Sequence, residues 1–115
     1  MIHTNIKAIA FGLAASITSA SSHAATNVQF ALDWKFEGPS APYFLAIDNG
    51  HFSAAGLEVE ISPGKGSLDA IPKVATGAFP VGFADINSLI KFLDQNPGAP
   101  VTAVMMVYDL SLIHI

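Results

Sequence analysis

Short apolar strand patterns alternate with helical patterns along this chain, and this order constrains the fold more than any other feature. Strands are predicted at Val28–Leu32, Leu57–Ile61, Val81–Ala84 and Val101–Val107. The last of them shows no alternation, which is typical of a strand buried on both faces. Strands that are joined through helices form parallel sheets with right-handed crossovers, so we expect an α/β fold with a parallel sheet in βαβαβαβ order.

The helical segments have recognisable starts and ends. They are predicted at Ser40–Gly50, His51–Gly56, Ser67–Gly77 and Asp85–Asn96. Three of them begin with Ser or Asp, whose side-chain oxygens cap free N–H groups at a helix start, and glycine or asparagine closes each one. Pro72 falls in the interior of the third, so either that helix starts later than Ser67 or it is kinked.

The Leu57–Ile61 strand alternates strictly, with Glu58 and Glu60 on one face. Such a strand belongs near the edge of a sheet, where one face is solvated. We expect it to pair in parallel with Val28–Leu32. A solvated strand face explains the two glutamates better than a catalytic carboxylate pair does.

Polar and aromatic residues follow each predicted strand. They are Asp33-Trp34, Gly64–Ser67, Ala84-Asp85 and Tyr108-Asp109. Loops at the carboxyl ends of parallel strands form the ligand crevice of open α/β sheets. Trp34 could therefore stack on a flat ligand there, or it could simply plug the top of the core.

A glycine-rich loop, Pro63-Gly64-Lys65-Gly66-Ser67, leads into the third helix. Free N–H groups at a helix start favour negative charge, and glycines let a ligand approach the backbone, so this corner could receive an anion. An ordinary strand-to-helix turn needs the same glycines. Asp85 is similarly open to two interpretations, as a cap of its own helix or as a crevice residue.

The charged and metal-binding residues exclude several classes of function. The net charge is −4, and five scattered lysines without any arginine make no stripe that could follow nucleic-acid phosphates. The absence of cysteine excludes a thiolate zinc site and a cysteine-linked lipid anchor within this sequence. His51 has no second ligand at useful spacing, so we expect no metal and no cofactor.

The first residues have the pattern of a secretory signal peptide. Lys7 supplies a positive charge, Ala8–Ala15 is a short apolar run, and Ser22-His23-Ala24 is a small-x-Ala cleavage site. The run is shorter than the roughly 20 apolar residues of a membrane-spanning helix. We expect cleavage after Ala24 and a periplasmic protein without a lipid anchor. A buried N-terminal helix is the alternative.

Taken together, these segments resemble the substrate-binding proteins of ABC importers with the SsuA/THI5-like (NMT1/THI5) domain, which have the type II periplasmic binding protein fold. The resemblance covers Val28 to Asp109. The segments that carry it are Leu32-Asp33-Trp34, Ala46 to Phe52, Ala55 to Val59, Gly64 to Ser67, Val74 to Gly77 and Val81 to Asp85.

The resemblance implies a two-lobed protein that closes on a small organic molecule and delivers it to ABC permease subunits in the inner membrane, with no chemistry. Thiamine-precursor pyrimidines, flavins and sulfonates are ligands in this family, and the full-length protein is expected to be monomeric. Carried over by position, the ligand-binding residues of this lobe would be Asp33, Trp34, Gly64, Lys65, Gly66, Ser67, Asp85 and Tyr108.

The resemblance also suggests how the chain is divided. Residues 1–24 would be the signal peptide and residues 25–109 a partial N-terminal lobe, truncated before the second lobe. We interpret residues 110–115 as an extraneous tail, although they could prolong the last strand. A strand that returns from the second lobe would normally lie between Val81–Ala84 and Val101–Val107, so the final strand should be badly paired or shifted.

Two other classes of protein compete with this interpretation. The first is the THI5-type pyrimidine synthase of thiamine biosynthesis, which the resemblance says uses pyridoxal phosphate and a cysteine-rich iron site. The signal-peptide pattern and the lack of cysteine argue against that enzyme. The second is an extracytoplasmic sensor domain, which would need a transmembrane helix beyond the present end.

Overall fold

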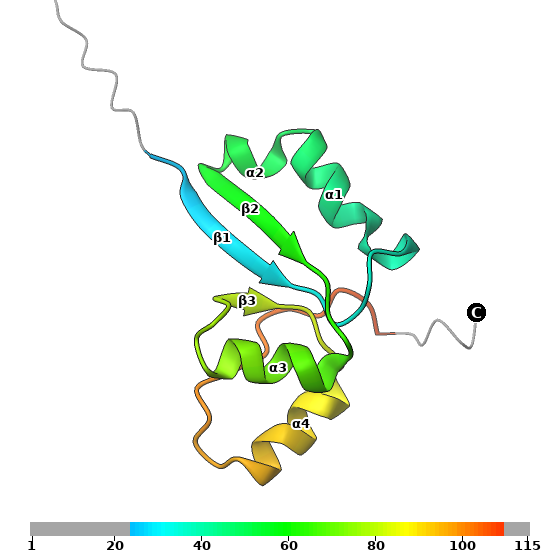
Figure 1. Ribbon diagram of the computed structural model, residues 1–115, viewed down its shortest axis with the longest axis vertical. Helices are drawn as coiled ribbons and strands as arrows, with labels where there is room; N and C mark the ends of the chain where they lie inside the picture. The colour runs from blue at the N-terminus through cyan, green and yellow to red at the C-terminus, as the bar shows by residue number, and fades with distance from the viewer. Residues whose placement is uncertain (1–23, 110–115) are drawn as a thin grey trace, which may run out of the picture.

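The computed structural model describes residues 24–109, and they form an α/β unit with three parallel strands (Figure 1). Its strands are β1 (Thr26–Ala31), β2 (Leu57–Ser62) and β3 (Val81–Gly82). Its helices are the short 3₁₀ turn η1 (Gly38–Ser40), α1 (Ala41–Asp48), α2 (His51–Ala54), α3 (Ser67–Ala75) and α4 (Ile86–Gln95). The predicted α/β class with a parallel sheet is confirmed. The tail prediction for 110–115 and nearly all of the predicted signal peptide lie outside the described residues.

Strand β1 is the centre of the sheet, whose order is β2-β1-β3. It pairs with β2 from Thr26↔Leu57 to Ala31↔Ser62, and with β3 only at Phe30↔Val81 and Ala31↔Gly82. The predicted parallel pairing and the edge position of the glutamate-bearing strand are therefore confirmed. Helix α2 lies beside β2, whereas α3 contacts β1 and β3 and also packs on α4 (Figure 1).

The core between β1, α3 and α4 is small. Its buried apolar side chains are Ala31, Leu32, Ala70, Ile71 and Leu89. The close approach of α3 to the sheet depends on Gly82, because a Cβ on this residue would lie 3.0 Å from a methyl carbon of Val74 and 3.2 Å from the Ala31 carbonyl oxygen. Small residues thus let the helix layer lie close to the strand ends.

The turn from β2 to α3 is bound to the end of β1 by backbone hydrogen bonds. Gly64 donates to the Trp34 carbonyl at 3.0 Å, and Gly66 donates to the Asp33 carbonyl at 2.5 Å. A Cβ on Gly64 would collide with the Leu32 carbonyl oxygen, so the backbones can approach this closely only with glycine. Gly66 has a φ of +122°, which other residues rarely adopt.

The helix starts confirm one predicted cap and correct two. The Asp85 carboxylate accepts a hydrogen bond from the Ser88 N–H at 2.9 Å and caps α4 as predicted. Ser40 precedes α1 but has helical dihedral angles, and its hydroxyl donates to the Glu37 carbonyl at 2.7 Å, so it closes η1 instead of capping α1. Gly66 is the N-cap of α3, and Ser67 is the first residue of the helix. The Ser67 hydroxyl does not cap α3, because it is hydrogen-bonded to the Asp33 carboxylate and the Asp85 N–H.

The position of α3 also decides between the two readings of Pro72. Since α3 begins at Ser67, the alternative of a later start is wrong, and Pro72 lies inside the helix. Proline has no N–H, so the Leu68 carbonyl lacks its usual helical donor at this point.

Two strand predictions need correction. Strand β3 has two residues instead of the four expected, and residues 101–107 form no strand at all among the described part of the chain. Val104 in that segment is 84% exposed, so it is not buried on both faces. An apolar, β-branched run becomes a strand only where a neighbouring backbone pairs with it, and the two residues of β3 pair with β1 alone. The expectation of a badly paired final segment agrees with this arrangement.

Candidate functional site

A hollow of about 160 Å³ lies beyond the carboxyl end of β1, where the ligand crevice was expected. It is lined by Leu32, Asp33, Trp34, Lys35, Glu37, Pro39, Ser40, Tyr43, Phe83 and Tyr108. These residues come from the β1–α1 loop, from α1, from the residue after β3 and from the C-terminal segment. The hollow therefore joins parts of the chain that are distant in sequence, and three predicted site residues, Asp33, Trp34 and Tyr108, meet in it.

Three aromatic residues that line the hollow, Tyr43, Phe83 and Tyr108, form a series of ring contacts. The Tyr43 ring lies 5.0 Å from that of Phe30 and 6.3 Å from that of Phe83, and Phe83 lies 5.7 Å from Tyr108. These separations are typical of tilted aromatic pairs. The series supplies an apolar wall on which a flat ligand could pack.

Tyr43 and Phe83 were not among the predicted site residues. The sequence pattern placed Tyr43 on the apolar face of a helix and Phe83 inside a strand. Phe83 lies at the rim because β3 ends before it, whereas the sequence pattern continued the strand through Ala84 and gave no signal for this position. Tyr43 carried no signal either, because its contacts with Phe30 and Phe83 depend on tertiary packing.

Trp34 is at the rim of the hollow and not in the core. Its side chain is 49% exposed, so the alternative that it plugs the top of the core is wrong. The Lys35 ammonium lies 6.0 Å from the centre of the Trp34 ring, within cation–π range. The exposed indole is available to a ligand, and its role as an aromatic platform stays a prediction.

Asp33 is partly buried at the inner side of the hollow. Its carboxylate accepts a hydrogen bond from the Ser67 hydroxyl at 3.5 Å, which is longer than the roughly 2.5–3.0 Å of strong O–H···O bonds. Desolvation by burial raises the pKa of Asp33 above its usual 3.8; the Asp85 charge adds to this, while hydrogen bonds from its own backbone and from Ser67 oppose it. Burial also raises the pKa of Tyr43, and the neighbouring Tyr108 and Asp33 raise it further. The Asp33 carboxylate therefore lies near enough to Tyr43 to disfavour the ionised form of its hydroxyl.

Ser67 and Asp85 lie behind Asp33 and do not line the hollow. The Ser67 hydroxyl oxygen accepts a hydrogen bond from the Asp85 N–H at 2.9 Å while its proton is directed to Asp33. This one hydroxyl links the loops that follow all three strands. Both residues are thus placed to orient Asp33, and direct contact with a ligand stays a prediction for them.

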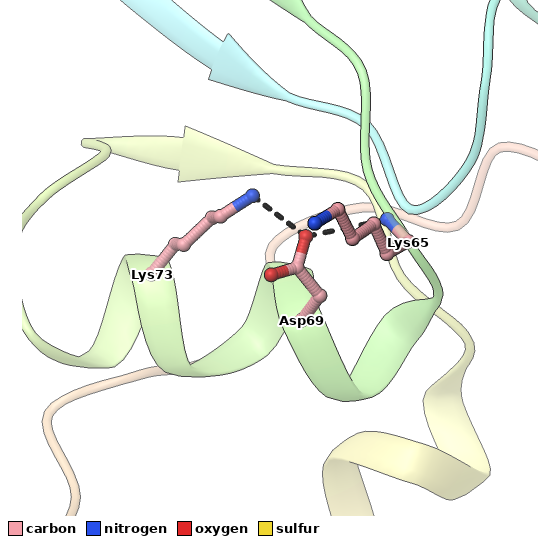
Figure 2. A network of polar contacts seen from close by, with 3 residues as sticks. All are labelled: Lys65, Asp69 and Lys73. Carbon is pink, nitrogen blue, oxygen red and sulfur yellow. Dashed lines mark hydrogen bonds and ion pairs between the residues drawn. The ribbon is translucent and has the colours of Figure 1, made fainter.

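The glycine-rich loop uses its own N–H groups internally. Gly64 and Gly66 donate to carbonyls of the β1–α1 loop, and the Lys65 N–H donates to the Asp69 carboxylate at 3.2 Å. The same carboxylate also binds the Lys73 ammonium at 2.6 Å, a contact drawn in Figure 2. These three N–H groups of the loop are therefore used to hold the strand-to-helix turn, and anion binding at the start of α3 stays a prediction.

Lys65 itself is exposed and is not brought to the hollow. Gly64 and Gly66 support the hollow indirectly, by holding the backbone of Trp34 and Asp33. Direct contacts of Gly64, Lys65 and Gly66 with a ligand stay predictions. The hydrogen bond from Lys73, followed by smaller contributions from Lys65, lowers the pKa of Asp69.

Among residues 24–109, no group of three or more histidine, cysteine, aspartate or glutamate side chains is arranged to hold a metal ion. Among the same residues, no helix combines the length and the apolar character needed to cross a membrane.

The parallel α/β sheet, with an aromatic hollow at the carboxyl ends of its strands, agrees with part of a lobe of a periplasmic binding protein. The chain belongs to the NMT1/THI5 like family, whose model matches residues 38–115. It is 30% identical over 98 residues to the formylaminopyrimidine-binding protein of Halalkalibacterium halodurans. That match covers 85% of this chain but only 29% of the relative, and no solved structure matches the chain.

Proposed function

We propose that this chain forms one wall of the binding site of a periplasmic solute-binding component of an ABC importer. In this proposal the protein binds a small organic molecule and delivers it to permease subunits, and it catalyses no reaction. The family and the printed name of the relative support a role in binding a pyrimidine or a similar compound. A thiamine-precursor pyrimidine, a flavin or a sulfonate would each be a candidate.

The observation that carries the proposal is the hollow at the ends of the strands. It combines an exposed indole, a series of aromatic rings and one partly buried carboxylate, the combination of apolar wall and few polar groups that small-molecule sites use. Its volume of about 160 Å³ is roughly half of the smallest usual ligand site of ~300 Å³. In this proposal a second wall closes over the ligand and supplies the rest of the site.

We also propose that the protein is exported and cleaved after Ala24, since the N-terminal pattern is that of a signal peptide. N-terminal sequencing of the product from a periplasmic extract should begin at Ala25. A soluble cytoplasmic product that retains Met1 would contradict export.

The binding proposal is tested by titration calorimetry on the full-length gene product with pyrimidines, flavins and sulfonates. One of these classes should bind saturably, and Trp34→Ala should weaken that binding by roughly tenfold to a hundredfold, because a buried aromatic contact is commonly worth ~1–3 kcal/mol. Phe36→Ala is the matched control, since Phe36 is an equally exposed aromatic residue of the same loop that does not line the hollow. Equal losses in the two variants, or no binding at all, would refute the proposal.

A further inference from the structure

The hollow has an uneven distribution of charge. The charged residues that line it are Asp33, Lys35 and Glu37, and Asp85 lies close behind Asp33. Lys35 is the only cation among the lining residues, and its ammonium is placed near the Trp34 ring at the rim. The inner part of the hollow is therefore governed by carboxylates.

Asp33 is the carboxylate that a ligand in the hollow would meet. Within residues 24–109 the only ion pair is Lys73–Asp69, on the exposed side of α3, so no cation of the described residues pairs with Asp33. The hydrogen bond that its carboxylate accepts from the Ser67 hydroxyl is long at 3.5 Å, and the residue's own backbone N–H contributes the other. Oxygen lone pairs of this group thus remain available to a donor.

The electrostatic surroundings make a donor favourable there. The pKa of Asp33 is raised mainly by burial, which means that its ionised form is poorly solvated. A ligand N–H that donates to this carboxylate would replace part of the lost water. An anionic ligand in the same position would instead be repelled by the Asp33 carboxylate, and the charge of Asp85 behind it would add to that repulsion.

We propose that Asp33 makes this wall selective by charge, because it accepts a hydrogen bond from an N–H group of the ligand and disfavours ligands that carry a sulfonate or a phosphate. This inference rests on the proposed binding function and narrows its ligand class. It assigns Asp33 as a specificity-determining residue and leaves the aromatic wall to hold the flat part of the ligand.

The test compares three probes by titration calorimetry on the full-length gene product at neutral pH. They are an aminopyrimidine, the methylpyrimidine of the same shape in which a methyl group replaces the amino group, and benzenesulfonate. The aminopyrimidine should bind more tightly than the methylpyrimidine by roughly tenfold to a hundredfold, which is the usual worth of a hydrogen bond to a charged group. Benzenesulfonate should bind more weakly than either pyrimidine.

Variants of Asp33 assign the preference to this residue. Asp33→Asn, which keeps the size and an acceptor oxygen but removes the charge, should lower aminopyrimidine affinity by less than this factor and narrow the gap to benzenesulfonate. Asp33→Glu should retain part of the preference, and Glu60→Gln, which removes one charge on the exposed face of β2, should leave it unchanged. Far-UV circular dichroism verifies that each variant is folded.

The outcomes separate this inference from the function on which it rests. Tighter binding of benzenesulfonate, or an unchanged preference in folded Asp33→Asn, would overturn charge selection while the binding function stands. Failure of the three probes and of every flavin, pyrimidine and sulfonate tested would overturn the binding function and the inference with it.

Discussion

Replacing Gly64 by alanine should destabilise the fold more than an alanine at any other position of the β2–α3 turn. The added Cβ would collide with the Leu32 carbonyl oxygen and lie 2.7 Å from the Asp33 carbonyl carbon. Both are backbone atoms, so no side-chain rotation relieves the contact. The turn must therefore move away from the end of β1.

The structure sets the size of this effect. Overpacking in a tight site costs about 1–3 kcal/mol. Displacing the turn also breaks the hydrogen bonds from Gly64 to Trp34 and from Gly66 to Asp33, each worth a net ~1 kcal/mol. The expected loss in the free energy of unfolding is about 3–5 kcal/mol. This is comparable with the whole free energy of unfolding of a marginally stable small domain, ~5 kcal/mol.

Urea denaturation of the purified chain, followed by far-UV circular dichroism, measures this loss as a lower midpoint or as the absence of a folded baseline. Gly38→Ala is the matched control, because a Cβ on Gly38 would meet nothing within 4 Å and the residue has no positive φ. Its free energy of unfolding should stay within about 0.5 kcal/mol of the parent's. Equal stability of the two variants would refute the close approach of the turn to β1.

Two further predictions concern the helix starts. Asp85→Ala removes the hydrogen bond from the Ser88 N–H and should lower the free energy of unfolding by about 0.5–2 kcal/mol. Asp85→Asn can still accept that bond and should lower the free energy of unfolding less. Equal losses in the two variants would argue against capping. Lys73 and Lys65 lower the pKa of Asp69 below 3.8, so its ionised form stabilises the fold above that pH, and this stabilisation is lost as the pH falls through the lowered pKa. The stability difference between the parent chain and Asp69→Asn should therefore shrink in acid. An unchanged difference in a pH series of urea midpoints would contradict the pairing.

The features that sequence patterns predicted well are those that depend on neighbouring residues. Alternation over Leu57–Ile61 identified β2 and its exposed edge, and the Asp85 side chain caps the helix that follows it because both partners lie within three residues. Local chemistry decides such features. The same reasoning failed for Ser67, whose hydroxyl binds the backbone of Asp85, 18 residues away, in preference to its own helix start.

The aromatic side of the hollow illustrates the second limit of sequence patterns. Tyr43 and Phe83 look like ordinary core residues in their own segments, since periodicity reports only which face of an element is apolar. The ring contacts that bring them to the hollow join α1, the end of β3 and the C-terminal segment. Only the order of strands in the sheet places those three segments together.

Residues 101–107 have the composition of a strand but no pairing partner among residues 24–109, and this affects how the neighbouring lining residue Tyr108 is fixed in position. Asp33 and Trp34 are fixed by backbone hydrogen bonds to Gly66 and Gly64, whereas Tyr108 is held through its ring contact with Phe83. Within the described chain, the backbone of residues 103–107 has no hydrogen bond to another segment, and Val104 and Met105 are exposed. Tyr108 is therefore the lining residue whose position would change most if a neighbouring strand paired with this run, and the shape of the hollow on that side depends on such pairing.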